Sequence, residues 1–139
     1  MRSRGVVQLC TIVDAWSPEA QAYDLGRRCL QALLSEPGWV VRILTKNAAV
    51  QRDFDVVEKH RDRVLVGLSL TGTVSMERQL ATIERNASPL SERIAALQEA
   101  MERLRPINKP RFLLSTSNLV ESELARIQTH DVDMRWLGK

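Results

Sequence analysis

Two short apolar runs, separated by one helical segment and each followed by polar residues, constrain the fold of this chain more than any other feature. The first run, 39–45, leads into Lys46, and the second, 64–70, leads into Thr71. Strands that are buried on both faces of a parallel sheet read as nearly continuous Val, Ile and Leu runs. In such folds ligands bind beyond the carboxyl ends of the strands. The pattern therefore predicts a parallel α/β fold with its site just after these runs.

Strand-like and helical segments alternate along the whole chain. The predicted strands are 6–13, 39–45, 64–70, 112–114 and 132–137. The predicted helices follow Ser17-Pro18, carry Val50 to Val57, run from Ser75 to Ile83, include Ile94 to Leu104, and follow Ser117 or Asn118. Repeating βα units indicate a mainly parallel sheet with right-handed crossovers, either open or partly closed into a barrel. The fold class is therefore α/β.

The chain length limits this reading to a single α/β domain over residues 1–139. A complete (β/α)8 barrel needs roughly 200 residues or more, and this chain has 139. Spacings of three and four place Ala22, Leu25, Cys29 and Leu33 on the inner face of the first helix. The same periodicity predicts that Leu97 packs against the sheet.

The composition gives little information on which partners the chain binds. The chain has 20 Lys+Arg against 17 Asp+Glu and no basic block, so nucleic-acid binding is neither indicated nor excluded. A nucleic-acid interface would need six basic residues to form one continuous face: Arg27, Arg28, Arg42, Lys46, Arg52 and Arg63. No stretch approaches the ~18 apolar residues of a membrane span, and a soluble cytoplasmic protein is the expectation. The two cysteines, Cys10 and Cys29, lack metal-ligand spacing and are interpreted as buried structural thiols.

Period-two alternation along the strands brings four polar side chains to one rim, the edge formed by the carboxyl ends of the strands. Lys46 extends the second strand, Ser69 and Thr71 share a side of the third, and the equivalent set in the first strand ends at Asp14. These groups could hold a small polar ligand that carries a carboxylate, ribose or phosphate. The alternative remains open that Lys46 is solvated and that the hydroxyls only satisfy loop backbone groups.

Several short motifs follow one another in a fixed order. They are Ile43–Asn47, Val50–Asp53, Val66–Thr71 and Ile83–Ser88, with Arg93 downstream. In this order they resemble the radical S-adenosylmethionine proteins of the spore photoproduct lyase-like group, often labelled DNA repair photolyase. Asp14, Pro18 and Glu19 are similar to that family's Asp-Pro-Tyr-x-Pro-x-Glu element, with Ala15 and Trp16 in place of Pro and Tyr. The likeness covers 5–104, and 105–139 reads as a divergent βαβ-like end.

The resemblance implies part of a TIM-like (β/α)6 partial barrel that binds a 4Fe-4S cluster and S-adenosylmethionine and generates a 5′-deoxyadenosyl radical. It implies that Lys46 and Ser69 contact the methionine moiety or ribose of S-adenosylmethionine, with Thr71 as a further candidate. An ammonium complements the carboxylate of this cofactor, and a hydroxyl can donate to its oxygens. For Glu84 and Arg93 we expect an ion pair or a helix-positioning role.

The chain departs from the family at the cluster. The family holds its cluster with a Cys-x3-Cys-x2-Cys loop, and two cysteines cannot supply those three thiolates. We therefore expect a truncated or degenerate relative that does not catalyse alone, and whether it acts as an enzyme stays open. The alternative is a non-catalytic α/β domain that binds a nucleotide-like ligand or a partner. A missing first strand would also leave an exposed sheet edge next to 6–13, which predicts self-association.

Overall fold

The fold is an α/β arrangement built around one parallel sheet, as the computed structural model describes it for residues 4–104, 112–116 and 132–133. The strands are β1 (Gly5–Leu9), β2 (Trp39–Thr45), β3 (Val64–Leu70), β4 (Phe112–Thr116) and β5 (Val132–Asp133). The helices are α1 (Pro18–Gln21), α2 (Leu25–Ser35), α3 (Phe54–Lys59), α4 (Glu77–Ile83) and α5 (Leu90–Arg103). Two 3-10 helices, η1 (Ala48–Asp53) and η2 (Val74–Met76), precede α3 and α4.

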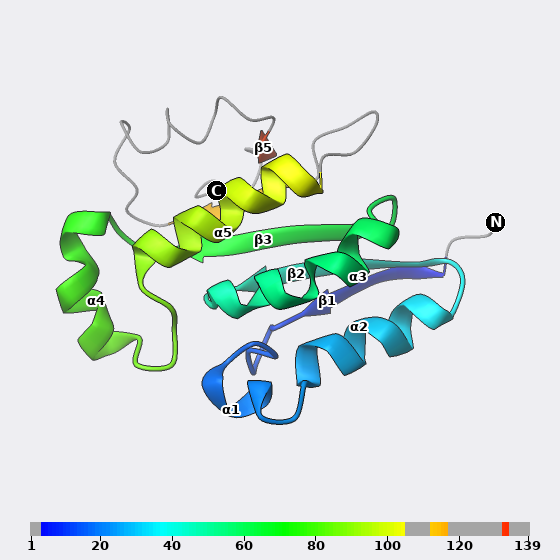
Figure 1. The fold of residues 1–139 in the computed structure, drawn as a ribbon, viewed down its shortest axis with the longest axis horizontal. Coiled ribbons are helices and arrows are strands. Elements are labelled where there is room, and N and C mark those ends of the chain that lie inside the picture. The colour runs from blue at the N-terminus through cyan, green and yellow to red at the C-terminus, as the bar shows by residue number, and fades with distance from the viewer. Residues whose placement is uncertain (1–3, 105–111, 117–131, 134–139) are drawn as a thin grey trace.

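The five strands lie side by side in chain order, and every neighbouring pair is parallel. Figure 1 shows α2, α3 and α5 on the same face of the sheet, with α4 beyond the carboxyl end of β3. Crossovers of one hand between strands added in one direction place all their helices on one face. The predicted alternation of βα units around a parallel sheet is therefore confirmed. The helix predicted after Ser117 and the strand residues predicted after Asp133 lie outside the described residues.

Side chains alternate between the two faces of the central strands, as the sequence predicted. Val41, Ile43 and Leu68 have no exposed surface and point toward the helices. Arg42 and Leu44 follow Val41 and Ile43 in β2. They are half-buried on the face of the sheet that these helices leave uncovered. The β1, β2 and β3 strands thus build the core on one side only.

Helix α5 closes the core over β3. Leu97 and Met101 are fully buried, which confirms the prediction that Leu97 packs inward. Burying a side chain of this size stabilises the fold by about 1.5–3 kcal/mol. Arg93 lies one helical turn before Leu97 and is also buried, at 2% exposure.

The first strand is shorter than the sequence predicted. The run 6–13 is apolar except at Gln8 and Thr11, yet β1 ends at Leu9 because the next residue, Cys10, has a φ of 69°. This left-handed conformation turns the chain out of the sheet. Ile12 and Val13 consequently lie in a loop and are 95% and 69% exposed.

The first predicted helix is divided in two. Ser17 caps α1 through a 3.3 Å bond from the Ala20 amide, as expected for a Ser-Pro start. Asp24, with a φ of 49°, then separates α1 from α2. This break rotates α2, so the predicted inner face was only partly right. Gly26, Leu30 and Leu34 are the buried residues of α2, whereas Leu33 is half-buried against the core, Cys29 is half-buried, and Ala22 and Leu25 are exposed.

A buried hydrogen-bonded group joins these helices to η1. The indole Nε1 of Trp16 donates to Oδ2 of Asp53 at 2.8 Å, and Arg27 bonds the other oxygen of Asp53 at 3.1 Å. Arg27 also forms a two-point ion pair with Asp55, which lowers the pKa of that carboxyl to about 2. These contacts fix the loop after β1 against the helix layer.

The short helix predicted from Ser75 begins later than expected. Ser75 lies within η2, where its hydroxyl pairs with that of Thr73 at 2.6 Å, and α4 starts at Glu77. Glu77 in turn accepts bonds from the amide and hydroxyl of Ser91 in the first turn of α5. Within the described residues, no helix is both long enough and apolar enough to cross a membrane.

Candidate functional site

An ion pair between Lys46 and Glu84 lies where β2 leaves the sheet. The Nζ atom of Lys46 is 2.5 Å from Oε1 of Glu84. Two bonds hold their segments together: the Ser88 amide donates to the Lys46 carbonyl at 3.0 Å, and the Ala48 amide donates to the Ser88 hydroxyl at 2.8 Å. The loop that carries Glu84 is therefore fixed directly against the end of β2.

The second oxygen of Glu84 faces different partners. Oε2 accepts from Nη2 of Arg93 at 2.7 Å and from the hydroxyl of Thr71 at 3.0 Å. Arg93 also donates to the backbone carbonyls of Ser69 and Ser88. The expected ion pair between Glu84 and Arg93 is confirmed, and the buried guanidinium joins α5 to the end of β3.

The charge on Glu84 is favoured despite its burial. Burial by itself would raise the pKa of this carboxyl, but the hydrogen bonds from Lys46 and Arg93 and the bond from Thr71 outweigh it and lower the pKa. Glu84 is therefore a carboxylate at neutral pH. The group of three charged side chains contains two cations and one anion.

Asp14 reaches the same end of the sheet from the loop after β1. Its carboxylate accepts from the Thr45 hydroxyl at 2.7 and 2.8 Å, from the Lys46 amide at 3.1 Å, from the Asn47 side chain at 2.9 Å and from the Trp16 amide at 2.9 Å. Asp14 was predicted to reach the rim by strand alternation, which was wrong because β1 ends at Leu9. The position was right, since these bonds connect the loop to the end of β2.

Cys10 contacts two residues of this loop and helps to fix it. Its Sγ accepts from the Ala15 amide at 3.4 Å and lies 3.8 Å from Oδ1 of Asp14, to which the thiol can donate. Burial raises the pKa of the Cys10 thiol to about 12, and the nearby Asp14 carboxylate adds to the effect. Cys10 is thus a protonated thiol, as expected for a structural cysteine.

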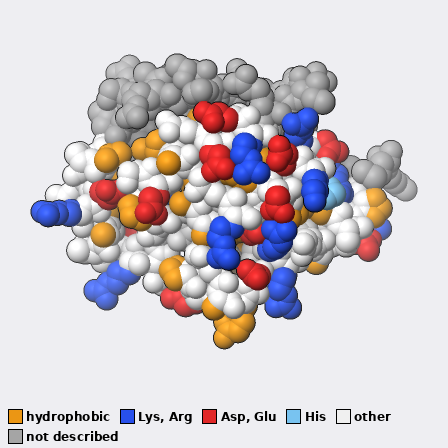
Figure 2. All heavy atoms as spheres, in the orientation of Figure 1, with side chains coloured by type: hydrophobic (Ala, Val, Ile, Leu, Met, Phe, Trp, Pro, Cys, Tyr) orange, Lys and Arg blue, Asp and Glu red, His pale blue; other side chains and the backbone are white. Residues whose placement is uncertain are grey.

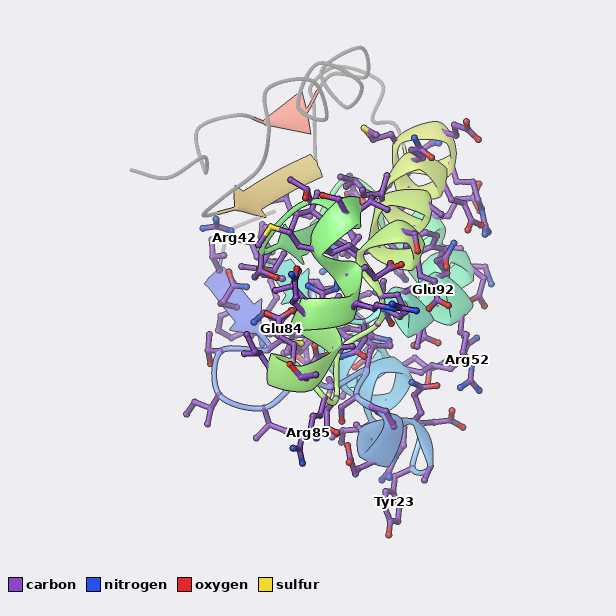
Figure 3. All side chains as sticks on the ribbon, turned by 90° about the vertical axis from the view of Figure 1, so that its left-hand side faces the viewer. Tyr23, Arg42, Arg52, Glu84, Arg85 and Glu92 are labelled. Atoms are coloured by element: carbon purple, nitrogen blue, oxygen red, sulfur yellow. The ribbon has the colours of Figure 1, made fainter. Side chains whose placement is uncertain are left out.

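An open pocket of about 860 Å³ lies beside Asp14 and Lys46. Glu84 also lines it, and Figure 3 shows Glu84 near α4, with Arg85 and Tyr23 at the lower border of the molecule. Its charged lining consists of three acidic residues, Asp14, Glu19 and Glu84, and two basic residues, Lys46 and Arg85. The lining thus carries one more negative than positive charge.

Much of the exposed lining of this pocket is apolar, although Glu19 and Arg85 are exposed there too. Five of the exposed large hydrophobic residues among those described also line it: Ile12, Val13, Tyr23, Leu25 and Ile83. They come from the loop after β1, the α1–α2 connection, the start of α2 and the end of α4, so no single sequence motif contained them. The pocket therefore combines a charged floor with an apolar entrance and fits a ligand that has both kinds of group.

The structure brings the predicted site residues together only in part. Asp14 and Lys46 both line the pocket. Thr71 does not line it but bonds Glu84, and Ser69 meets the network only through its carbonyl. Glu84 is the pocket residue that alternation along the strands could not find, because it lies in the polar connection after α4.

The residues present do not fit the 4Fe-4S cluster that the resemblance implies. The chain has two cysteines, against three thiolates in the family's loop. Cys10 is held as a thiol inside the loop after β1, and the half-buried Cys29 lies on α2. Within the described residues, no group of three or more His, Cys, Asp or Glu side chains is placed to hold a metal ion.

The basic residues considered for nucleic-acid binding do not form one face. Arg27 lies on α2 and pairs with Asp53 and Asp55, whereas Arg42 lies on the face of the sheet away from the helices. Figure 2 shows basic and acidic side chains interspersed over the helix-covered side. This arrangement does not favour a nucleic-acid interface there.

A scan against protein-family models found no match, and neither curated proteins nor solved structures gave one.

Proposed function

We propose that the chain is a portion of a radical S-adenosylmethionine-type partial (β/α)6 barrel, and that it binds S-adenosylmethionine at the carboxyl ends of its strands. Sequential parallel strands with helices on one face support the barrel reading. The motif order of the sequence supports the choice of ligand. In this proposal the chain binds the ligand and does not catalyse by itself.

One observation carries the proposal: Lys46 presents an ammonium group to the pocket. Its side chain is 43% exposed, although it is paired with Glu84. The ammonium complements the α-carboxylate of S-adenosylmethionine. The excess of acidic residues in the pocket lining suits this ligand, because its ammonium and sulfonium groups outnumber its carboxylate.

Calorimetric titration and thermal unfolding with S-adenosylmethionine test the proposal. A ligand that binds only the folded chain stabilises it by about 2.7 kcal/mol at one hundred times its Kd. We expect the wild-type chain and Lys59→Gln, an exposed lysine at the end of α3, to be stabilised alike. Lys46→Gln should lose most of the effect. Absence of binding at millimolar ligand would refute the proposal.

The missing thiolates are tested separately. Anaerobic incubation with iron and sulfide is expected to give no stable 4Fe-4S chromophore on this chain alone. A stable brown species with the absorption of such a cluster would show that the chain supplies ligands by another route.

The alternative is a non-catalytic α/β domain for another nucleotide-like ligand or a partner. Its support is the apolar entrance of the pocket, formed by Ile12, Val13 and Ile83, which does not depend on Lys46. Binding of adenosine as tight as that of S-adenosylmethionine, with both affinities unchanged in Lys46→Gln, would favour this alternative.

A further inference from the structure

The two oxygens of Glu84 have separate tasks. Oε2 is held by Arg93 and Thr71, while Oε1, among the residues that the structure describes, is hydrogen-bonded only to Lys46. If Lys46 moves away, Glu84 stays paired with the buried Arg93 and keeps its position. The carboxylate then has one free oxygen at the pocket wall.

Exposure shows which partner can move. The side chain of Arg93 is 2% exposed and that of Glu84 is 11% exposed, against 43% for Lys46. Lys46 is a long side chain whose charged end is already partly in water, so turning it costs little desolvation. Glu84 and Arg93 are fixed by bonds to two backbone carbonyls and a hydroxyl.

We propose that Lys46 and Glu84 together recognise the α-amino acid head group of the ligand, which rests on the function proposed above. Lys46 turns to pair with the ligand carboxylate, and Oε1 of Glu84 accepts from the ligand ammonium in place of the lysine. Lys46, Glu84 and both charges of the ligand head group are then paired. In the free chain Lys46 occupies the place of the ligand ammonium.

This assignment makes Glu84 a specificity residue. A ligand with a carboxylate alone would take Lys46 from Glu84 without replacing it, and a ligand without either charge gains nothing at this pair. Separating Lys46 from the largely buried Glu84 without a replacement loses a charged hydrogen bond, which is unfavourable. The site should therefore discriminate S-adenosylmethionine from 5′-methylthioadenosine, which has the same nucleoside and no amino acid.

The experiment measures the Kd of both compounds for the full chain by calorimetric titration. We expect wild type to bind S-adenosylmethionine at least tenfold more tightly than 5′-methylthioadenosine, since a charged hydrogen bond contributes about 1.5–3 kcal/mol. Lys46→Gln and Glu84→Gln should each reduce this preference at least tenfold and leave the 5′-methylthioadenosine affinity unchanged. Lys59→Gln and Glu92→Gln, exposed residues outside the pocket lining, are the matched controls.

Because Glu84→Gln removes the carboxylate from a buried guanidinium, it can unfold the chain, and Glu84→Asp then decides the result. It keeps the charge for Arg93 and withdraws the oxygen from the pocket by one methylene. An unchanged preference in Glu84→Asp, or a loss of both ligands by the folded variant, overturns the inference while the proposed function stands. If wild type binds neither compound, both the inference and the proposed function are overturned.

Discussion

The backbone of Gly26 lies directly against the indole ring of Trp16: a methyl group at position 26 would be 2.3 Å from Cε2 and 2.6 Å from Nε1 of the ring. The ring cannot retreat easily, because its Nε1 is bonded to the buried Asp53 and its exposure is 2%. The glycine therefore permits the close contact between α2 and the loop after β1.

Gly26→Ala is accordingly expected to destabilise the fold, although alanine favours a helix by about 1 kcal/mol over glycine. Forcing extra volume into a packed core costs about 1–3 kcal/mol, and the 2.3 Å contact places this site near the upper end. Urea unfolding measures the change. Arg28→Ala, an exposed change on the same helix, should stay within about 0.5 kcal/mol of wild type. A Gly26→Ala chain as stable as wild type would contradict the packing described here.

Glu84 makes the free energy of unfolding depend on pH in the acid range. Its pKa in the folded chain is lowered from the ordinary value of 4.5, so folding favours the ionised form. The stabilisation is complete above pH 4.5 and is lost as the pH falls through the lower folded-state pKa. The free energy of unfolding, measured in urea from neutral to acid pH, should therefore fall more steeply in wild type than in Glu84→Gln. Parallel curves for the two chains would show that the carboxylate is not stabilised by Lys46 and Arg93.

Cys10 should react slowly with thiol reagents. The chain with Cys29→Ser isolates Cys10, whose pKa of about 12 leaves little thiolate at pH 8. Alkylation by iodoacetamide at that pH is expected to be slow in the folded chain and to accelerate when the chain is unfolded in guanidinium. Equal rates in the two states would mean that the fold does not bury Sγ as described.

The free edge of β1 is a candidate surface for self-association. Among the described strands, β1 pairs only with β2, its five residues carry no charge, and Val6 is 59% exposed. Unblocked edges of this kind pair with other chains. We predict that light scattering detects a dimer at high concentration and that Val6→Lys weakens it. Ile83→Lys, at another exposed apolar position away from the edge, is the control. A monomer at all concentrations would refute the prediction.

The strand positions could be predicted because buried parallel strands leave a direct signal in the sequence. The runs that became β2 and β3 are continuous and apolar, and period-two alternation placed Ile43 and Leu68 on the covered face. The boundaries of the helices were harder to predict. The break at Asp24 depends on one residue in a left-handed conformation, and it shifts the buried face of α2 from Leu33 to Leu34.

The residues of the candidate site were likewise predictable only in part. Lys46 follows a predictable strand, so its place at the rim could be inferred from the sequence. Glu84 reaches Lys46 only because the loop after α4 folds back and bonds to β2 through Ser88, a contact between residues far apart in the chain. The apolar entrance was missed because Ile12 and Val13 look like strand residues, and only the turn at Cys10 exposes them.

Among the described strands, each pairs only with its immediate neighbours in the sequence. Repeat proteins share this property, and their stability is a sum of unit stabilities and nearest-neighbour couplings. Cooperativity here depends on how strongly each βα unit is coupled to the next. The bond from Trp16 to Asp53 and the attachment of Glu84 to Lys46 each join adjacent βα units, so both strengthen a coupling between neighbours. The pocket thus lies on one of the couplings that make the domain unfold as a unit, and a ligand bound there would raise cooperativity together with stability.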